Sequence, residues 1–129
     1  MKNFEYTVET NKSFEDAVNA VEQNTAAKGF RVLHTHDVAA TLAEKGFQRE
    51  PLKIVEICNA KYAHEVLQKD ITTALMLPCP ITVYTQAGKT RIGAMRPTML
   101  GEFFPDKGIE PVAQQVEKVV LEIVNESAR

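Results

Sequence analysis

ITVYTQAGKTRIGAM, residues 81–95, is the stretch of sequence that decides the fold. Two runs rich in β-branched residues flank a turn at residues 86–89, where Gly88 supplies the positive φ that a tight turn needs. The pattern predicts a β-hairpin. The sheet that contains it must therefore be at least partly antiparallel.

Two long amphipathic helices are predicted on either side of this region. The first spans about residues 13–28, where Ser13 and Asp16 resemble a capping box. The last opens near Glu110, with Pro111 in its first turn. The inward positions are Phe14, Ala17, Val18, Val21 and Thr25 in the first helix, and Ile109, Val112, Val116, Val119, Val120 and Ile123 in the last. Helices with one apolar face need a sheet to cover.

The other elements complete an alternating order. Strands are predicted at residues 4–9, 30–38 and 52–58, and shorter helices begin after the caps Asp37 and Asn59. Apolar residues on both faces of 52–58 place that strand in the middle of the sheet. Pro78 and Pro80 predict a loop or a sheet edge before the hairpin. Together these elements predict an α+β two-layer sandwich of one domain, residues 1–129, and not a doubly wound fold.

Composition narrows the class of protein. The chain has 129 residues, 44% of them hydrophobic and 25% charged, as in an ordinary folded domain. The net charge is −2 and the basic residues are scattered, so we expect no nucleic-acid partner. We also expect no membrane span and no signal peptide, hence a cytoplasmic protein with reduced thiols.

The chain holds two cysteines, and both lie near predicted strand ends. Cys58 precedes the cap Asn59, so nearby helix N–H groups should favour its thiolate and lower its pKa. Cys79 lies between two prolines. If their strands are neighbours, both sulfurs lie at one end of the sheet. They then either form a site or are two buried small hydrophobic residues, because their spacing matches no zinc template.

The histidines form a weaker candidate site. His34 and His36 are two residues apart on a strand, so their rings share a face and could meet one metal ion beside Asp37. The alternative is a solvated strand face. His64 lies on the polar face of its helix, and Gln68 stands where a zinc-protease helix would carry a second histidine.

Several stretches, taken in order, resemble the family called domain of unknown function 302. They are residues 12–18 (KSFEDAV), KGF at 28–30 with Asp37, ICNAKYAHEVL at 57–67 and LMLPCPITVY at 75–84. The resemblance covers nearly the whole chain. It implies a small α+β domain with a curved antiparallel sheet, a homodimer and a cysteine-lined region, but no catalysed reaction. Ala60 and Pro80 depart from the residues that many members carry.

Three kinds of function stay open. The first is a binding domain whose pocket holds a soft metal ion or a small ligand, with Cys58 and Cys79 as donors and Asn59 as a polar contact. The second is a thiol-dependent redox enzyme that uses Cys58 as nucleophile. The third is a dimer-forming structural protein without a small ligand. We favour the first because no C-x-x-C motif or positioned base is present. No catalytic residue is predicted, and the sequence leaves open whether a cofactor is bound.

Overall fold

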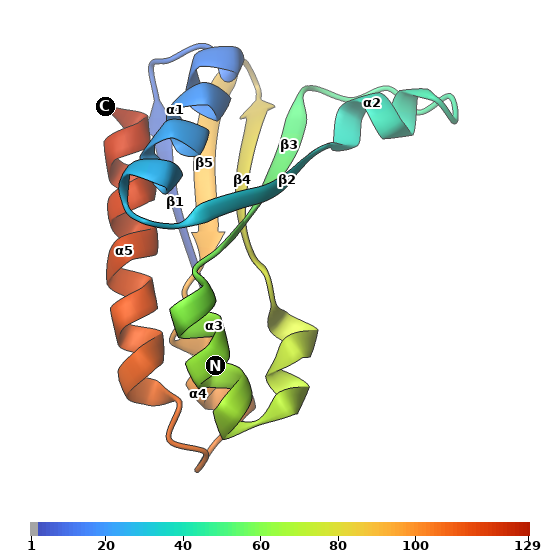
Figure 1. Cartoon of the computed structure of the whole chain (residues 1–129). Helices are drawn as coiled ribbons and strands as arrows, with labels where there is room; N and C mark the ends of the chain where they lie inside the picture. Colours follow the sequence, from blue (N-terminus) through green and yellow to red (C-terminus); the bar gives the residue numbers. More distant parts are fainter. Residues whose placement is uncertain (1–2) are drawn as a thin grey trace.

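A five-stranded antiparallel sheet in the order β1–β5–β4–β3–β2 forms one layer of the computed structural model (Figure 1), which describes residues 3–129. The strands are β1 (Glu5–Thr10), β2 (Arg31–Asp37), β3 (Leu52–Cys58), β4 (Cys79–Gln86) and β5 (Lys89–Met95). The predicted hairpin is β4–β5, and its turn residues Ala87 and Gly88 have φ values of 52° and 79°. The α+β prediction is confirmed.

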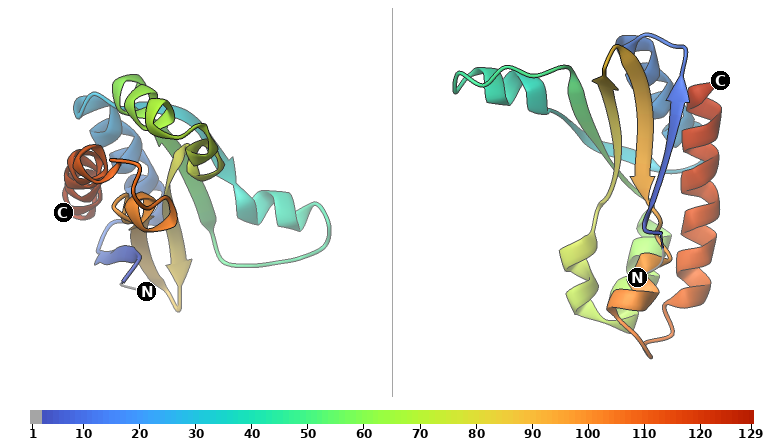
Figure 2. Two further views of the ribbon diagram at one scale, coloured as in Figure 1. Left: turned by 90° about the horizontal axis from the view of Figure 1, so that it is seen from below. Right: turned by 180° about the vertical axis from the view of Figure 1, so that it is seen from behind.

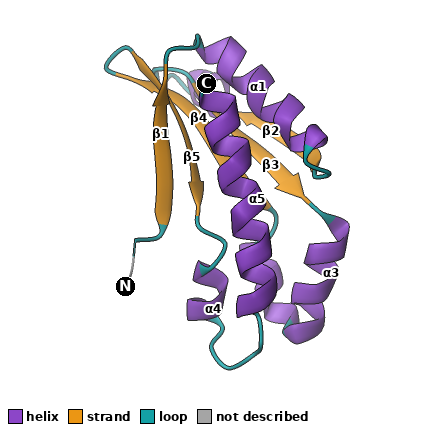
Figure 3. Ribbon diagram, turned by 90° about the vertical axis from the view of Figure 1, so that its left-hand side faces the viewer, coloured by secondary structure: helices purple, strands orange, loops and turns teal. Residues whose placement is uncertain are grey.

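The two long helices cover one face of the sheet (Figure 3). They are α1 (Phe14–Ala27) and α5 (Glu110–Ala128), which pack against each other and against the strands. The Ser13 side chain caps α1, as the capping motif predicts, by accepting from the Asp16 N–H at 3.1 Å. The core between the layers contains Val18 and Val21 of α1, Val55, Ile57, Ile81, Val83 and Ile92 of the sheet, and Val120 and Ile123 of α5.

The shorter helices lie at the two ends of the sheet. They are α2 (Val38–Ala43), α3 (Ala60–Lys69), the 3₁₀ helix η1 (Ile71–Met76) and α4 (Met99–Phe103). Asp37 caps α2 and Asn59 caps α3, as predicted. Sequence patterns predict no helix at residues 71–76 or 99–103, yet both segments are helical. Both helices are short, and packing beside α3 and α5 stabilises them where local sequence signals are weak.

Strand β3 lies between β4 and β2, so it is interior, as predicted, although β4 is the central strand. One prediction about the sheet needs correction. Pro80 does not mark a loop or an edge, because it is the second residue of β4 and pairs with Glu56. Pairing of β4 with β5 begins one residue later, at Ile81. The absent N–H of Pro80 therefore falls where the ladder is still incomplete.

The face of the sheet turned away from α1 and α5 carries no helix (Figure 2). Strand alternation and register assign its residues, which we call the open face: Glu5, Thr7 and Glu9 on β1, Arg91, Gly93 and Met95 on β5, Pro80, Thr82 and Tyr84 on β4, Leu52, Ile54 and Glu56 on β3, and His34 and His36 on β2.

Residues 38–51, which include α2, extend from β2 and β3 away from α5, and we call them the arm (Figures 1 and 2).

Gly93 provides a test of the sheet's packing. A Cβ at this position would lie 2.6 Å from Thr7 Oγ1 and 3.4 Å from Thr82 Oγ1. We expect Gly93→Ala to lower the free energy of unfolding by about 1–2 kcal/mol, because Thr7 has few alternative rotamers. Urea unfolding measures this change. Thr7→Ala in the same chain should recover part of the loss.

The matched control is Gly101→Ala. Its Cβ would meet only the far end of the exposed Glu110 side chain, which can move away. An unfolding midpoint for Gly93→Ala equal to that of Gly101→Ala would contradict the close packing of β1 on β5.

Candidate functional site

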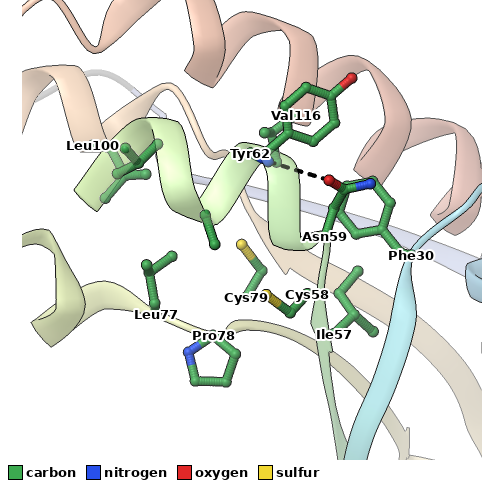
Figure 4. Close-up of a pocket in the computed structure, with 12 residues that line it drawn as sticks. Phe30, Ile57, Cys58, Asn59, Tyr62, Leu77, Pro78, Cys79, Leu100 and Val116 are labelled. Carbon is green, nitrogen blue, oxygen red and sulfur yellow. Dashed lines mark hydrogen bonds between the residues drawn. The ribbon is translucent and has the colours of Figure 1, made fainter. Parts of the chain in front are cut away.

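A hollow lies where β3 and β4 meet α3 (Figure 4). Its cavity volume is about 30 Å³, and the empty space that includes open solvent at its mouth is about 360 Å³. The walls come from β3, α3, the segment before β4, α4 and α5. The lining residues are Phe30, Ile57, Cys58, Asn59, Tyr62, Ala63, Val66, Leu77, Pro78, Cys79, Leu100 and Val116. Only Asn59 brings an amide side chain to this wall, so the hollow is predominantly apolar.

Both cysteines line the hollow, and both are free thiols. Cys79 opens β4 opposite Ile57, on the helix-covered side of the sheet. Cys58 is the last residue of β3 and pairs with Arg31 of β2. The strand register therefore does not match the two cysteines with each other. Each cysteine contributes to the lining of the hollow from its own strand, Cys58 from β3 and Cys79 from β4.

Asn59 has a structural task at the edge of the hollow. Its Oδ1 accepts from the Tyr62 N–H at 3.2 Å and caps α3. Its Nδ2 donates to the Gly29 carbonyl oxygen at 3.2 Å, which joins α3 to the segment before β2. The polar contact expected of Asn59 is thus already used within the chain, and a ligand would meet mainly carbon and sulfur.

Comparisons with known proteins identify the family of the chain. The family model described as domain of unknown function DUF302 matches residues 6–127. The chain belongs to this family. It is similar to an uncharacterized conserved DUF302 protein from Bacillus stearothermophilus, whose crystal structure has a TM-score of 0.91, with 31% identity over 98% of each chain. No curated protein matches the chain.

The thiols of this DUF302 domain are held neutral. Burial raises the pKa of Cys79 to about 11, and electrostatic repulsion from Cys58 adds to this shift. Burial also raises the pKa of Cys58. The expectation of a lowered Cys58 pKa is therefore wrong. Cys58 precedes the cap instead of standing in the first turn of α3, and desolvation by the apolar wall is the dominant effect.

The donor set around the thiols does not form a metal centre. Within residues 3–129, no group of three or more His, Cys, Asp or Glu side chains is placed to hold a metal ion. A tetrahedral zinc site needs four ligands, and thiol ligands must lose their protons. The two cysteines supply two ligands and have raised pKa values, so they fit a zinc ion poorly.

The histidines lie away from the hollow. His34 and His36 share the open face, as predicted, and their ring centroids are 4.4 Å apart. His36 Nε2 lies 2.9 Å from Glu56 Oε1. His64 is exposed on α3, as predicted. None of the three lines the hollow.

The sequence interpretation located part of this wall and missed the rest. It placed the two cysteines and the segment before β4 at the end of the sheet. It did not find Phe30, Tyr62, Leu100 or Val116, which come from the loop before β2 and from α3, α4 and α5. The ring centroids of Phe30 and Tyr62 lie 6.0 Å apart. Their apolar character gave no local signal, since each resembles an ordinary core residue.

Within the residues that the structure describes, no helix has the length and apolar character that a membrane span requires.

The double role of Asn59 leads to a stability prediction. Asn59→Ala should lower the free energy of unfolding by about 1–2 kcal/mol, because α3 loses its cap and the Gly29 carbonyl loses a donor. Asn59→Asp keeps the capping oxygen and should lose less. Urea denaturation of both variants distinguishes these effects. Equal midpoints for the alanine variant and the parent chain would contradict the assigned role.

The raised thiol pKa values lead to a reactivity prediction. At pH 7.5, Cys58 should react with iodoacetamide no faster than free cysteine. Cys79 should react roughly 100-fold more slowly than an unperturbed thiol, because two pKa units reduce the thiolate fraction by that factor. Peptide mapping by mass spectrometry gives both rates.

The control for this experiment is the same chain unfolded in urea, in which both cysteines should react alike. A folded-state Cys58 that reacts faster than free cysteine would show a lowered pKa and would support the redox-enzyme alternative.

Proposed function

We propose that this DUF302 domain is a binding module that takes a small apolar group into the hollow at the end of β3 and β4. The observation that carries the proposal is the wall itself, which is apolar and contains two neutral thiols. Binding sites for small ligands are usually preformed concave surfaces lined mainly by apolar side chains.

The size of the hollow limits the ligand. A cavity volume of about 30 Å³ accepts a group of one to a few heavy atoms, such as the end of an alkyl chain. The wider mouth leaves room for the rest of a larger molecule. An apolar cavity of this kind stays free of water, because water would lose most of its hydrogen bonds there.

The thiols contribute polarizable surface to this site. A neutral cysteine behaves as a small hydrophobic residue, and its sulfur makes favourable contacts with apolar and aromatic groups. Cys79 is packed against the core, and Cys58 is the last residue of β3, next to the cap Asn59. Both residues therefore stay in the proposed ligand-binding set, as contacts and not as nucleophiles.

A soft-metal site has weaker support. It would have to deprotonate Cys58 and Cys79 against their raised pKa values, and the described residues provide no third His, Cys, Asp or Glu ligand nearby. A redox enzyme has weaker support for the same electrostatic reason, because the attacking species is the thiolate. Two free thiols also suit a reducing compartment, and we therefore propose the cytoplasm as the location.

Xenon tests the apolar hollow directly. Titration of the chain with xenon should give saturable shifts in the amide NMR signals of α3 and the start of β4. Ala63 lines the hollow and Ala60 is exposed on the same helix. We expect Ala63→Leu to fill the space and abolish the shifts, and Ala60→Leu to leave them unchanged.

A smaller change protects this test against misfolding. Ala63→Val should weaken the shifts while it perturbs α3 less. Xenon shifts that are absent from the parent chain, or that persist in Ala63→Leu, would contradict an accessible apolar hollow.

Titration with Zn²⁺ and with Cu⁺ under reducing conditions tests the metal alternative. We expect no stoichiometric binding. Binding of one ion per chain that is lost in Cys58→Ser and in Cys79→Ser would show that the site binds a soft metal ion and would contradict an apolar ligand.

A further inference from the structure

The hollow has an inner side and an outer side, and the two cysteines mark them. Cys79 packs against the hydrophobic core, whereas Cys58 is not part of that packing. Exposure also increases along the end of β3, because Ile57 is fully buried while Cys58 and Asn59 are half-buried. The corner of the hollow that Cys58 and Asn59 form therefore lies toward solvent.

An arginine of β2 lies beside this outer corner. Arg31 stands opposite Cys58 in the antiparallel ladder of β2 and β3. Residues that pair in this way have Cα atoms roughly 4.5–5.5 Å apart and side chains on the same face. Phe30, the residue before Arg31, itself lines the hollow. The long Arg31 side chain can therefore bring its guanidinium group to the mouth of the hollow.

The guanidinium group of Arg31 is not used within the part of the chain that the structure describes. The residue is exposed, and no side chain among residues 3–129 forms an ion pair or a hydrogen bond with it. Arg91 and Arg96, in contrast, are paired with Glu9 and Glu117.

The nearest carboxylate along β3 does not neutralise this charge. Glu56 precedes Cys58 by two residues, and its Oε1 lies 2.9 Å from Nε2 of His36. The outer corner of the hollow thus has a positive charge beside an apolar wall. This combination complements a ligand that has an anionic group at one end and an apolar group at the other.

We infer that the hollow binds a carboxylic acid with a short alkyl chain, whose carboxylate is held by Arg31 and whose chain end enters the cavity. The inference rests on the proposed function, since it names the class of ligand for the same hollow.

A single guanidinium group favours a carboxylate over a phosphate. The planar fork of N–H donors matches the two oxygens of a carboxylate, and such bidentate pairs are among the stronger hydrogen-bonded contacts. A phosphate group carries about 1.5 to 2 negative charges at neutral pH and is better matched by two cations. Lys61 does not supply the second one, because the helical period turns it away from Ala63 and Val66, which line the hollow.

The dimensions of the hollow limit the alkyl chain. A cavity volume of about 30 Å³ holds only the end of the chain, so the remaining carbons lie in the mouth beside Cys58. A chain of about four to six carbons is long enough to join the cavity to a guanidinium group on the neighbouring strand. Free acids of this size have few atoms, and we expect a dissociation constant on the order of 1 mM.

Amide NMR titration with hexanoate tests the inference. Saturable shifts should appear in α3 and at the start of β4. Hexan-1-ol has the same alkyl chain without the charge and should bind about three- to tenfold more weakly. Acetate has the charge with almost no chain and should give no saturable shift.

Substitution of the arginine separates its role from that of the apolar wall. Arg31→Gln should raise the dissociation constant for hexanoate about three- to tenfold and leave the shifts with hexan-1-ol and with xenon unchanged. Arg31→Lys keeps the charge but loses the planar fork, so its affinity for hexanoate should be intermediate. Both changes are at an exposed side chain, and circular dichroism checks that the variants are folded.

Two matched variants serve as controls. Lys61→Gln removes a positive charge from the other side of α3, and Arg49→Gln removes an exposed guanidinium group from the arm. Neither should change the dissociation constant for hexanoate. An equal loss of affinity in Arg31→Gln and Lys61→Gln would overturn the inference, because the net charge and not Arg31 would then attract the acid.

The xenon titration distinguishes failure of this inference from failure of the proposed function. Xenon shifts in a chain that binds hexanoate no more tightly than hexan-1-ol would overturn the inference and leave the apolar binding site intact. A chain that binds neither xenon nor hexanoate would overturn both.

Discussion

The structure depends on one apolar seam between the central hairpin and the two long helices. Ile81, Val83 and Ile92 are fully buried there, against Val21 of α1 and Ile123 of α5. Burial of one such side chain contributes about 1.5–3 kcal/mol relative to its exposure in water. The seam commits both helices to the same face of the sheet and leaves the opposite face without cover.

The hollow follows from the same seam. With α1 and α5 placed over the middle of the sheet, the ends of β3 and β4 extend beyond α1, and α3 closes over them (Figure 3). Asn59 secures this arrangement by its bonds to α3 and to the Gly29 carbonyl oxygen. The apolar side chains of the wall desolvate both thiols, and this desolvation raises the pKa of each. The apolar wall therefore determines both the packing and the protonation of the thiols at this site. It favours the binding of an apolar group over chemistry that needs a thiolate.

Two regions of different chemical character thus lie in one small domain. The hollow lies on the helix-covered side, near the ends of the strands, and its wall is apolar. The open face and the arm lie on the other side, and their side chains are mixed in character. A change in one region need not affect the other. Cys58 and Phe47 illustrate the division, since the first lines the hollow and the second extends into solvent from the arm.

Local signals in the sequence determined the elements and their order. The cap at Ser13, the turn at Gly88 and the helical spacing of Val112, Val116 and Val120 each act within a few residues, so a sequence pattern suffices to find them. Tertiary structure alone decided that Pro80 enters the central strand and that Phe30, Leu100 and Val116 meet around two cysteines. It also decided the pKa of Cys58, because desolvation depends on neighbours supplied by distant segments. Contacts between distant segments form only when the apolar seam closes, and no spacing along the chain encodes them.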